Sequence, residues 1–178
     1  MEFLVLLEKR RSIRDYAENA TISKEEIGKM IYAAQQAPSW KNSQTGRYYV
    51  AITKESVERM RFALPQFNAE RTQNAVAYIV ACYKGKISGH DSQGQPVDNI
   101  GDAWGAYDLG LQNENLLLKA CELGYDTLVM GLRDSDAIAN LFGIPDDEII
   151  MSVIAIGKRA DTPTKPERKS VEEIVKFI

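Results

Sequence analysis

Hydrophobic residues gather in short, nearly continuous runs that predict buried strands. The clearest runs cover residues 76–83 and 149–156, where almost every side chain is apolar. Such runs are expected of strands that are covered on both faces. Two further segments, 47–53 and 127–130, are rich in β-branched and aromatic residues, which is typical of strands. The pattern therefore predicts strands at these positions.

Other segments repeat apolar residues at helical spacing. Ser23 and Glu26 have the spacing of a capping box, and a helix that starts there should end before Pro38, because the residue preceding proline avoids the helical region. Further helices are expected at 3–11, 54–64, 102–123 and 135–142, and after a second capping box at 170–173. Because helices and strands alternate irregularly, the predicted fold class is α+β.

The chain has 178 residues and shows neither a repeat nor a linker, which predicts a single domain over 1–178. Its formal net charge of −3 provides no global basic field for nucleic acid or anionic lipid. No apolar stretch is long enough to span a bilayer, and the basic residues at the N-terminus follow the apolar run, unlike those of a signal peptide. We therefore expect a cytoplasmic protein without nucleic-acid or membrane partners.

The cysteine and histidine content argues against a metal site. Cys82 and Cys121 lie in apolar stretches, no Cys-x-x-Cys pattern occurs, and His90 is the one histidine. A zinc site of Cys and His ligands would need more of them. We expect both cysteines to be small core residues and His90 to be exposed in the glycine-rich connection 84–100, which could also cover a ligand.

Three polar clusters could carry chemistry. The first, Arg10-Arg11-Ser12-Ile13-Arg14, offers guanidinium groups and a hydroxyl that suit a phosphate. Taken alone, the segment is more typical of a solvated basic turn whose cations favour a helix C-terminus. The second, at 37–44, could bind the edge of a heterocycle or simply connect a helix to a strand. The third, at 128–134, places Gly131 after a strand, where a ligand can approach the backbone, although an ordinary turn would look the same.

Taken together, these clusters resemble the nitroreductase family of flavoproteins. Its opening pattern Arg-x-Ser-x-Arg/Lys is matched by Arg10, Ser12 and Arg14. Its second pattern is matched by Ala37-Pro38-Ser39, Asn42 and Gln44, and its tail pattern by Gly157 and Arg168. The order and spacing of these elements agree over nearly the whole chain.

The resemblance implies a mostly antiparallel sheet flanked by helices in an intertwined homodimer, with the tail 158–178 extending onto the partner. It implies that FMN is bound non-covalently and that NAD(P)H is the co-substrate. A hydride would pass from NAD(P)H through flavin N5 to a small flat acceptor, such as a nitroaromatic or a quinone, by a ping-pong mechanism. Relatives of this fold also suggest an alternative, a flavin-dependent reductase of another small substrate, of dehalogenation or enone type. A second alternative, of another class, is a non-catalytic FMN carrier or sensor.

The resemblance also assigns roles to residues, with the chemistry on the flavin itself. Phosphate and ribityl contacts would come from the basic residues and hydroxyl Arg10, Arg11, Ser12, Arg14 and Arg168. Contacts from the partner subunit would come from Pro38, Ser39, Trp40 and Asn42. The backbone of Met130 and Gly131 would face N5 and O4, and Asn68 and Arg71 would lie near the pyrimidine ring.

The sequence departs from the family pattern at two places. Thr45-Gly46 stands where Pro-Trp often follows the second pattern, and Met130 stands where larger members often have an acidic residue before the glycine. The backbone contact would survive the second change, but the substrate pocket would differ. The chain is also short for the family, so extra lid helices are not expected.

Overall fold

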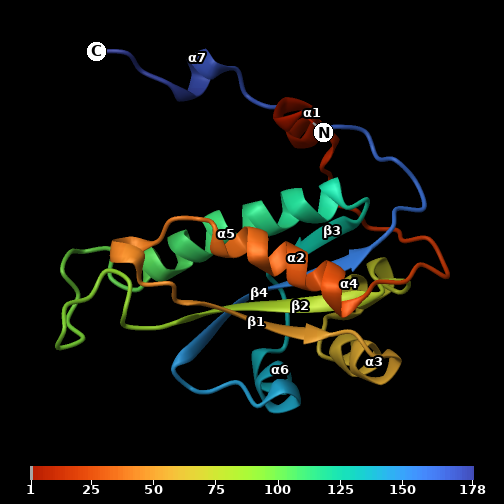
Figure 1. Ribbon diagram of the computed structural model, residues 1–178, viewed down its shortest axis with the longest axis horizontal. Coiled ribbons are helices and arrows are strands. Elements are labelled where there is room, and N and C mark those ends of the chain that lie inside the picture. The colour runs from red at the N-terminus through yellow and green to blue at the C-terminus, as the bar shows by residue number, and fades with distance from the viewer. Residues whose placement is uncertain (1) are drawn as a thin grey trace.

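The computed structural model describes residues 2–178, and its centre is a four-stranded antiparallel sheet (Figure 1). The strands are β1 (Gly46–Ala51), β2 (Ala77–Lys84), β3 (Asp126–Met130) and β4 (Glu148–Gly157). They lie in the order β1-β2-β4-β3, with every neighbouring pair antiparallel. Each of the four predicted strands is confirmed, with bounds that differ from the predicted ones by at most two residues.

Two helices cover each face of the sheet, which explains the continuous apolar runs in β2 and β4. On one face, α2 (Lys24–Gln35) and α5 (Ala103–Glu122) bury Met30 and Leu109 against Ile79 and Ile154. On the other, α3 (Lys54–Phe62) and α6 (Ser135–Phe142) complete a second core. The predicted α+β class, an antiparallel sheet flanked by helices, is confirmed.

The capping box predicted before α2 is present. The Ser23 hydroxyl accepts from the Glu26 amide at 3.2 Å, and the Glu26 carboxylate accepts from the Ser23 amide at 2.8 Å. Both orphan donors of the first turn are thereby satisfied. The helix ends at Gln35, close before Pro38 as predicted.

Two short elements were not predicted. The helix α4 (Gln66–Arg71) is too short to show a helical period, and the 3₁₀ turn η1 (Trp40–Asn42) lies in the expected polar loop. Lys41 and Asn42 have φ values of 44° and 57° in η1, a left-handed conformation that asparagine tolerates better than most residues.

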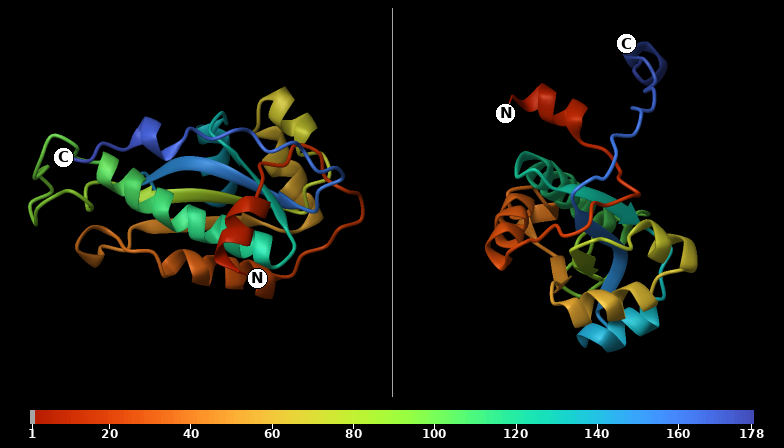
Figure 2. Two further views of the ribbon diagram at one scale, coloured as in Figure 1. Left: turned by 90° about the horizontal axis from the view of Figure 1, so that it is seen from above. Right: turned by 90° about the vertical axis from the view of Figure 1, so that its right-hand side faces the viewer.

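Both termini extend away from the sheet (Figure 2). Helix α1 (Phe3–Lys9) ends two residues before the predicted Arg11, because Arg10 already has an extended conformation with ψ of 131°. It contacts the body through Leu6, which packs on Leu118 and Cys121 of α5. The predicted last helix, α7 (Val171–Ile174), is a single turn in an exposed tail.

The cysteine prediction is confirmed, and the histidine prediction is wrong. Cys82 and Cys121 are buried and free. The side chain of His90 is only 4% exposed, and its Nδ1 lies 3.0 Å from the carbonyl oxygen of Ser88 within the folded connection 84–100. Within residues 2–178, no helix has the length and apolar character needed to cross a bilayer.

Candidate functional site

The basic segment, Arg10–Arg14, lies along the outer edge of β3. The Ile13 amide donates to the Thr127 carbonyl at 3.0 Å, in a parallel bridge between Ser12 and Thr127. Ser12 and Arg14 are exposed, and Arg14 Nη1 lies 3.4 Å from the Ser12 carbonyl oxygen. The sequence motif is therefore attached to the free edge of the sheet instead of forming a detached turn.

Arg10 and Arg11 are half-buried and differ in their contacts. Arg10 Nε lies 3.6 Å from the Glu114 carboxylate on α5. Arg11 donates through Nη1 to the Arg10 carbonyl at 2.6 Å. The backbone of this segment is thus fixed beside α5 and β3.

An ion pair that was not predicted anchors the same region. The Arg159 amide and its Nε each donate to the Asp126 carboxylate at 2.9 Å, and the hydrogen bonds raise the pKa of Arg159. Asp126 begins β3, and Arg159 follows β4. Only the register of these two strands brings the residues together, so the sequence alone carried no signal for the pair.

The open edge of β3 continues from the basic segment to Gly131. The Thr127 carbonyl points away from β4. Backbone amides and carbonyls alternate between the two edges of an antiparallel strand, so the backbone groups of Val129 and Gly131 point to the same open edge as those of Thr127. A Cβ at Gly131 would meet nothing within 4 Å. Met130 pairs with Val153, and its side chain lies in the core. The peptide between Met130 and Gly131 thus presents the Gly131 amide on this edge, about 13 Å along the strand from Thr127.

Helix α4 brings Asn68 to the end of β3. The buried Asn68 side chain donates through Nδ2 to the Leu132 carbonyl at 3.1 Å. Arg71 is exposed, and its guanidinium carbon lies 5.5 Å from the centre of the Phe67 ring. Asn68 therefore lies at the Gly131 turn, through a direct contact with the residue that follows Gly131, whereas Arg71 contacts a residue of its own helix.

The second motif is organised around a buried carboxylate. Asp108 Oδ2 on α5 accepts from the Trp40 amide at 3.0 Å and from the Ser88 hydroxyl at 2.8 Å. The Trp40 ring packs on Trp104, with the ring centroids 4.8 Å apart. These contacts join the 37–44 loop to α5 and to the connection 84–100.

Ser39 and Asn42 shape the rest of that loop. The Ser39 hydroxyl accepts from the Gln44 amide at 3.0 Å, and the Asn42 side chain accepts from Gln44 Nε2 at 3.3 Å. Pro38 and Asn42 are exposed. The loop is thus prearranged by its own polar groups, and its outer surface is free.

Asp108 was not singled out from the sequence. The sequence did contain a signal, because Asp108 is a charged residue next to Leu109 on the apolar side of the predicted helix. A carboxylate is rare at such a position, since a buried carboxylate needs several hydrogen-bond donors. Gln112, one turn further along α5, is also buried and lies 3.4 Å from the Tyr48 hydroxyl.

One chain does not bring all the predicted residues together. The basic segment, the Gly131 edge and Asn68 share one side of the sheet. The 37–44 loop contacts α5 at Asp108, about 9 Å along the helix from Glu114. Arg168 lies on the exposed tail, where Nη1 donates to the Pro166 carbonyl at 3.2 Å. Within residues 2–178, no three His, Cys, Asp or Glu side chains converge as metal ligands would.

Comparison with known proteins places the chain in a family. The sequence model of the Nitroreductase family matches residues 7–158. A protein of Archaeoglobus fulgidus, named as an NADH dehydrogenase/NAD(P)H nitroreductase, is 32% identical over 164 residues, covering 90% of this chain and 87% of that protein.

Two solved structures have the same fold. One, a nitroreductase from Exiguobacterium sibiricum in complex with FMN, superposes with a TM-score of 0.86 at 25% identity, covering 100% of this chain and 98% of that one. The other, an enone reductase of gut-bacterial fatty acid saturation, has a TM-score of 0.84 at 22% identity, covering 99% and 98%. The fold, the positions of the motifs and the family match agree, and the chain belongs to the nitroreductase family.

Proposed function

We propose that this protein is an FMN-dependent oxidoreductase that passes a hydride from NAD(P)H to a small flat acceptor. The observation that carries the proposal is the placement of the basic segment and Gly131 on one open edge of β3. An elongated ligand with a phosphate at one end and a ring system at the other fits such an edge. The FMN complex of the Exiguobacterium sibiricum relative supports this assignment.

The residues along the edge fit the two ends of FMN. Arg14 and Ser12 are exposed and supply donors for the phosphate, with Arg10 and Arg11 beside them. Arginine forks match phosphate oxygens two at a time. At the other end, the open space above Gly131 lets a ring approach its amide. Arg168 would add a further cation from the tail.

The site is complete only in a homodimer. In one chain the 37–44 loop lies away from the basic segment, so Pro38, Ser39, Trp40 and Asn42 would reach the cofactor of the partner. Several apolar side chains support an interface, because a monomer rarely exposes so many. They are Phe3, Leu4 and Val5 on α1, and Val171, Ile174, Phe177 and Ile178 on the tail.

The exposed side of α5 supports the same interface. Ala103, Tyr107 and Gly110 follow one another at helical spacing and are exposed, and a Cβ at Gly110 would meet nothing within 4 Å. Small residues allow two helices to approach closely. The tail 158–178, which is exposed along most of its length, would extend over the partner.

The bound flavin supplies the hydride chemistry, and the chain supplies position and charge. The Gly131 amide would donate to the ring near N5 and O4. Arg71 is exposed beside Asn68 and would place a cation near the pyrimidine ring, where negative charge is best stabilised by fixed donors. No side chain needs to act as a catalytic acid in this arrangement. Nicotinamide and acceptor would use the same exposed ring face in turn, which gives ping-pong kinetics.

Anaerobic titration tests this function. The FMN-loaded protein should be bleached by NADH or NADPH and recoloured by an acceptor panel of a nitroaromatic, a quinone and an enone. Initial rates at several fixed acceptor concentrations should give parallel double-reciprocal lines. Protein that binds FMN but is bleached by neither nicotinamide would be a carrier or sensor, and protein that cannot be loaded with FMN would contradict the whole proposal.

A further inference from the structure

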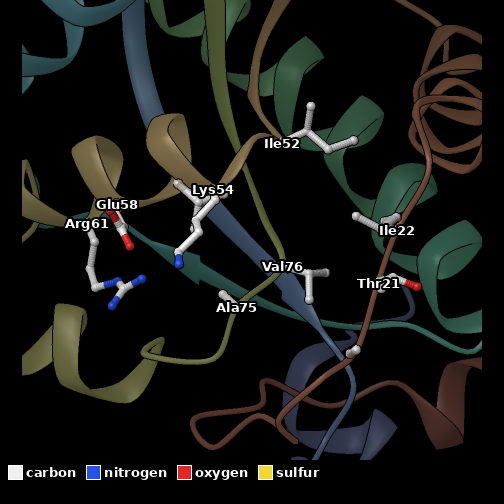
Figure 3. A pocket seen from close by; sticks show the side chains of 10 residues that line it. Thr21, Ile22, Ile52, Lys54, Glu58, Arg61, Ala75 and Val76 are labelled. Atoms are coloured by element: carbon white, nitrogen blue, oxygen red, sulfur yellow. The ribbon is translucent and has the colours of Figure 1, made fainter.

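A hollow of about 360 Å³ lies at the end of the sheet where β1 has ended and β2 begins (Figure 3). Its floor is formed where β1 has ended, at Ile52, and just before β2 begins, at Ala75 and Val76. One wall is α3, and the other is the segment 20–22 that precedes α2. None of the residues proposed to bind FMN lines this hollow. Its volume lies in the lower part of the range of small-molecule sites.

Three charged side chains reach the hollow from one face of α3. Lys54, Glu58 and Arg61 are spaced at i, i+4 and i+7, so they lie above one another on the helix. Figure 3 shows the side chains of Lys54 and Arg61 extending from α3 into the hollow, with the Glu58 carboxylate between them. The hollow therefore carries two cations and one anion on a surface whose other side chains are apolar, apart from Thr21.

Within the part of the chain that the structure describes, the two cations of this hollow form no close ion pair, and Glu58 balances only one of their two charges. Among the ion pairs of residues 2–178, none involves Lys54, Glu58 or Arg61 within 4.0 Å. Arg61 Nε is fully buried and has no hydrogen-bond partner. That atom is enclosed by the protein, so a ligand in the hollow would be bound by the terminal guanidinium nitrogens of Arg61 and by the ammonium group of Lys54.

We propose that this hollow binds a small monoanion with an apolar body, of the class of aromatic or short branched carboxylates. The carboxylate would accept from Arg61 and Lys54. The apolar body would pack on Ile22, Ile52, Val57 and Val76. Glu58 limits the net positive charge of the hollow, so a single negative charge matches it better than a phosphate dianion.

Methyl NMR of the FMN-loaded protein tests the site without relying on activity. With ¹³C-labelled Ile and Val methyl groups, benzoate should shift the signals of Ile22, Ile52, Val57 and Val76 saturably. Val129, on the open edge of β3, reports separately on binding beside the proposed cofactor. Benzamide, which has the same shape and no charge, should bind at least tenfold more weakly. Shifts confined to Val129, no shift at all, or equal affinity for benzamide would overturn the proposal.

Matched variants of α3 assign the charge. Arg61→Met should weaken benzoate binding by at least about tenfold, because a charge-assisted hydrogen bond is lost. Lys54→Met, at an exposed position that tolerates substitution, should weaken it several-fold. Arg59→Met removes an exposed cation from the same helix but outside the hollow, and should leave the affinity unchanged. Unchanged affinity in Lys54→Met and Arg61→Met, or an equal loss in Arg59→Met, would contradict the assignment.

Discussion

The Trp40 amide donates a 3.0 Å hydrogen bond to the carboxylate of Asp108, a residue of α5 that is only 2% exposed. The same carboxylate oxygen accepts from the Ser88 hydroxyl. One buried group on α5 therefore fixes both the 37–44 loop and the long connection 84–100. The 37–44 loop, which we propose to contact the partner's cofactor, is thus attached by a hydrogen bond to α5, the helix of the proposed dimer interface.

Replacement of Asp108 should destabilise the protein. Asp108→Ala leaves the Trp40 amide and the Ser88 hydroxyl buried without an acceptor, which should lower the free energy of unfolding by about 3 kcal/mol. Asp108→Asn keeps one acceptor and should cost less. Urea unfolding followed by circular dichroism measures both. The exposed Glu122→Gln on the same helix serves as control and should stay within about 0.5 kcal/mol. Equal stability of Asp108→Ala and the wild type would contradict this role.

Gly157 should not tolerate a side chain, because the Tyr16 ring covers it. A Cβ there would lie 2.5 Å from Tyr16 Cδ1, and Tyr16 is 2% exposed and cannot move aside. Gly157→Ala should therefore destabilise by about 1–3 kcal/mol. Gly28→Ala, at an exposed helix position with open space around it, should instead stabilise by about 0.5–1 kcal/mol. Thermal unfolding distinguishes the two signs, and a stabilised Gly157→Ala would show that Tyr16 can shift.

Gly157 shows the difference between features that local sequence patterns predict and features that depend on the fold. Gly157 was matched as part of a tail pattern, but the reason for it, the ring of Tyr16 packed across the sheet, depends on contacts between residues far apart in the chain. Strands with continuous apolar runs and the capping box of α2 were predictable, because their signals are local. The short α4 had no such signal, and His90 is buried by a fold of its connection that no local pattern encodes.

The candidate site was predictable in its parts but not in its assembly. The basic segment and Gly131 were found from residue type, and the structure adds that they share one edge of β3. Asp108 and the Arg159–Asp126 pair were missed, because a buried polar residue is recognised only once its donors are known. The distance of the 37–44 loop from the basic segment is likewise a property of the fold.

The capping box of α2 should give the stability a defined pH dependence. Hydrogen bonds from the Ser23 amide and hydroxyl, and from the Tyr125 hydroxyl, lower the pKa of Glu26. Because the pKa of Glu26 is lower in the folded than in the unfolded protein, its ionised carboxylate stabilises the fold. This stabilisation is fully present above the pKa of a glutamate in the unfolded chain, about 4.3, and is lost as the pH falls through the pKa of Glu26 in the folded protein.

Glu26→Gln measures this contribution. The difference in unfolding free energy between the wild type and Glu26→Gln should be largest above about pH 5 and should shrink as the pH falls below about 4. Urea unfolding at several pH values gives the difference, and Ser23→Ala in both backgrounds should remove most of it. A difference that grows on acidification would have the wrong sign for this mechanism.

Gly110 should be sensitive to size only if the homodimer forms through α5. Within one chain, its surroundings are open, so Gly110→Leu should leave the fold of the subunit intact. It should nevertheless separate the subunits and release FMN, because a large side chain prevents close helix approach. Light scattering after gel filtration, with absorbance of the eluted flavin, reports both. A dimeric, flavin-loaded Gly110→Leu, or a monomeric wild type that holds FMN, would contradict the proposed interface.

Comparison of FMN with riboflavin tests the central claim most directly, because the two ligands differ only in the phosphate. Flavin-free protein is titrated with each by fluorescence quenching. The basic segment should make FMN bind at least about a hundredfold more tightly than riboflavin, and Arg14→Ala should reduce this ratio by about tenfold or more, since a charge-assisted contact contributes roughly 1.5–3 kcal/mol. Arg59→Ala, an exposed cation elsewhere, should leave the ratio unchanged. Equal affinity for FMN and riboflavin, or no binding of either, would contradict the account.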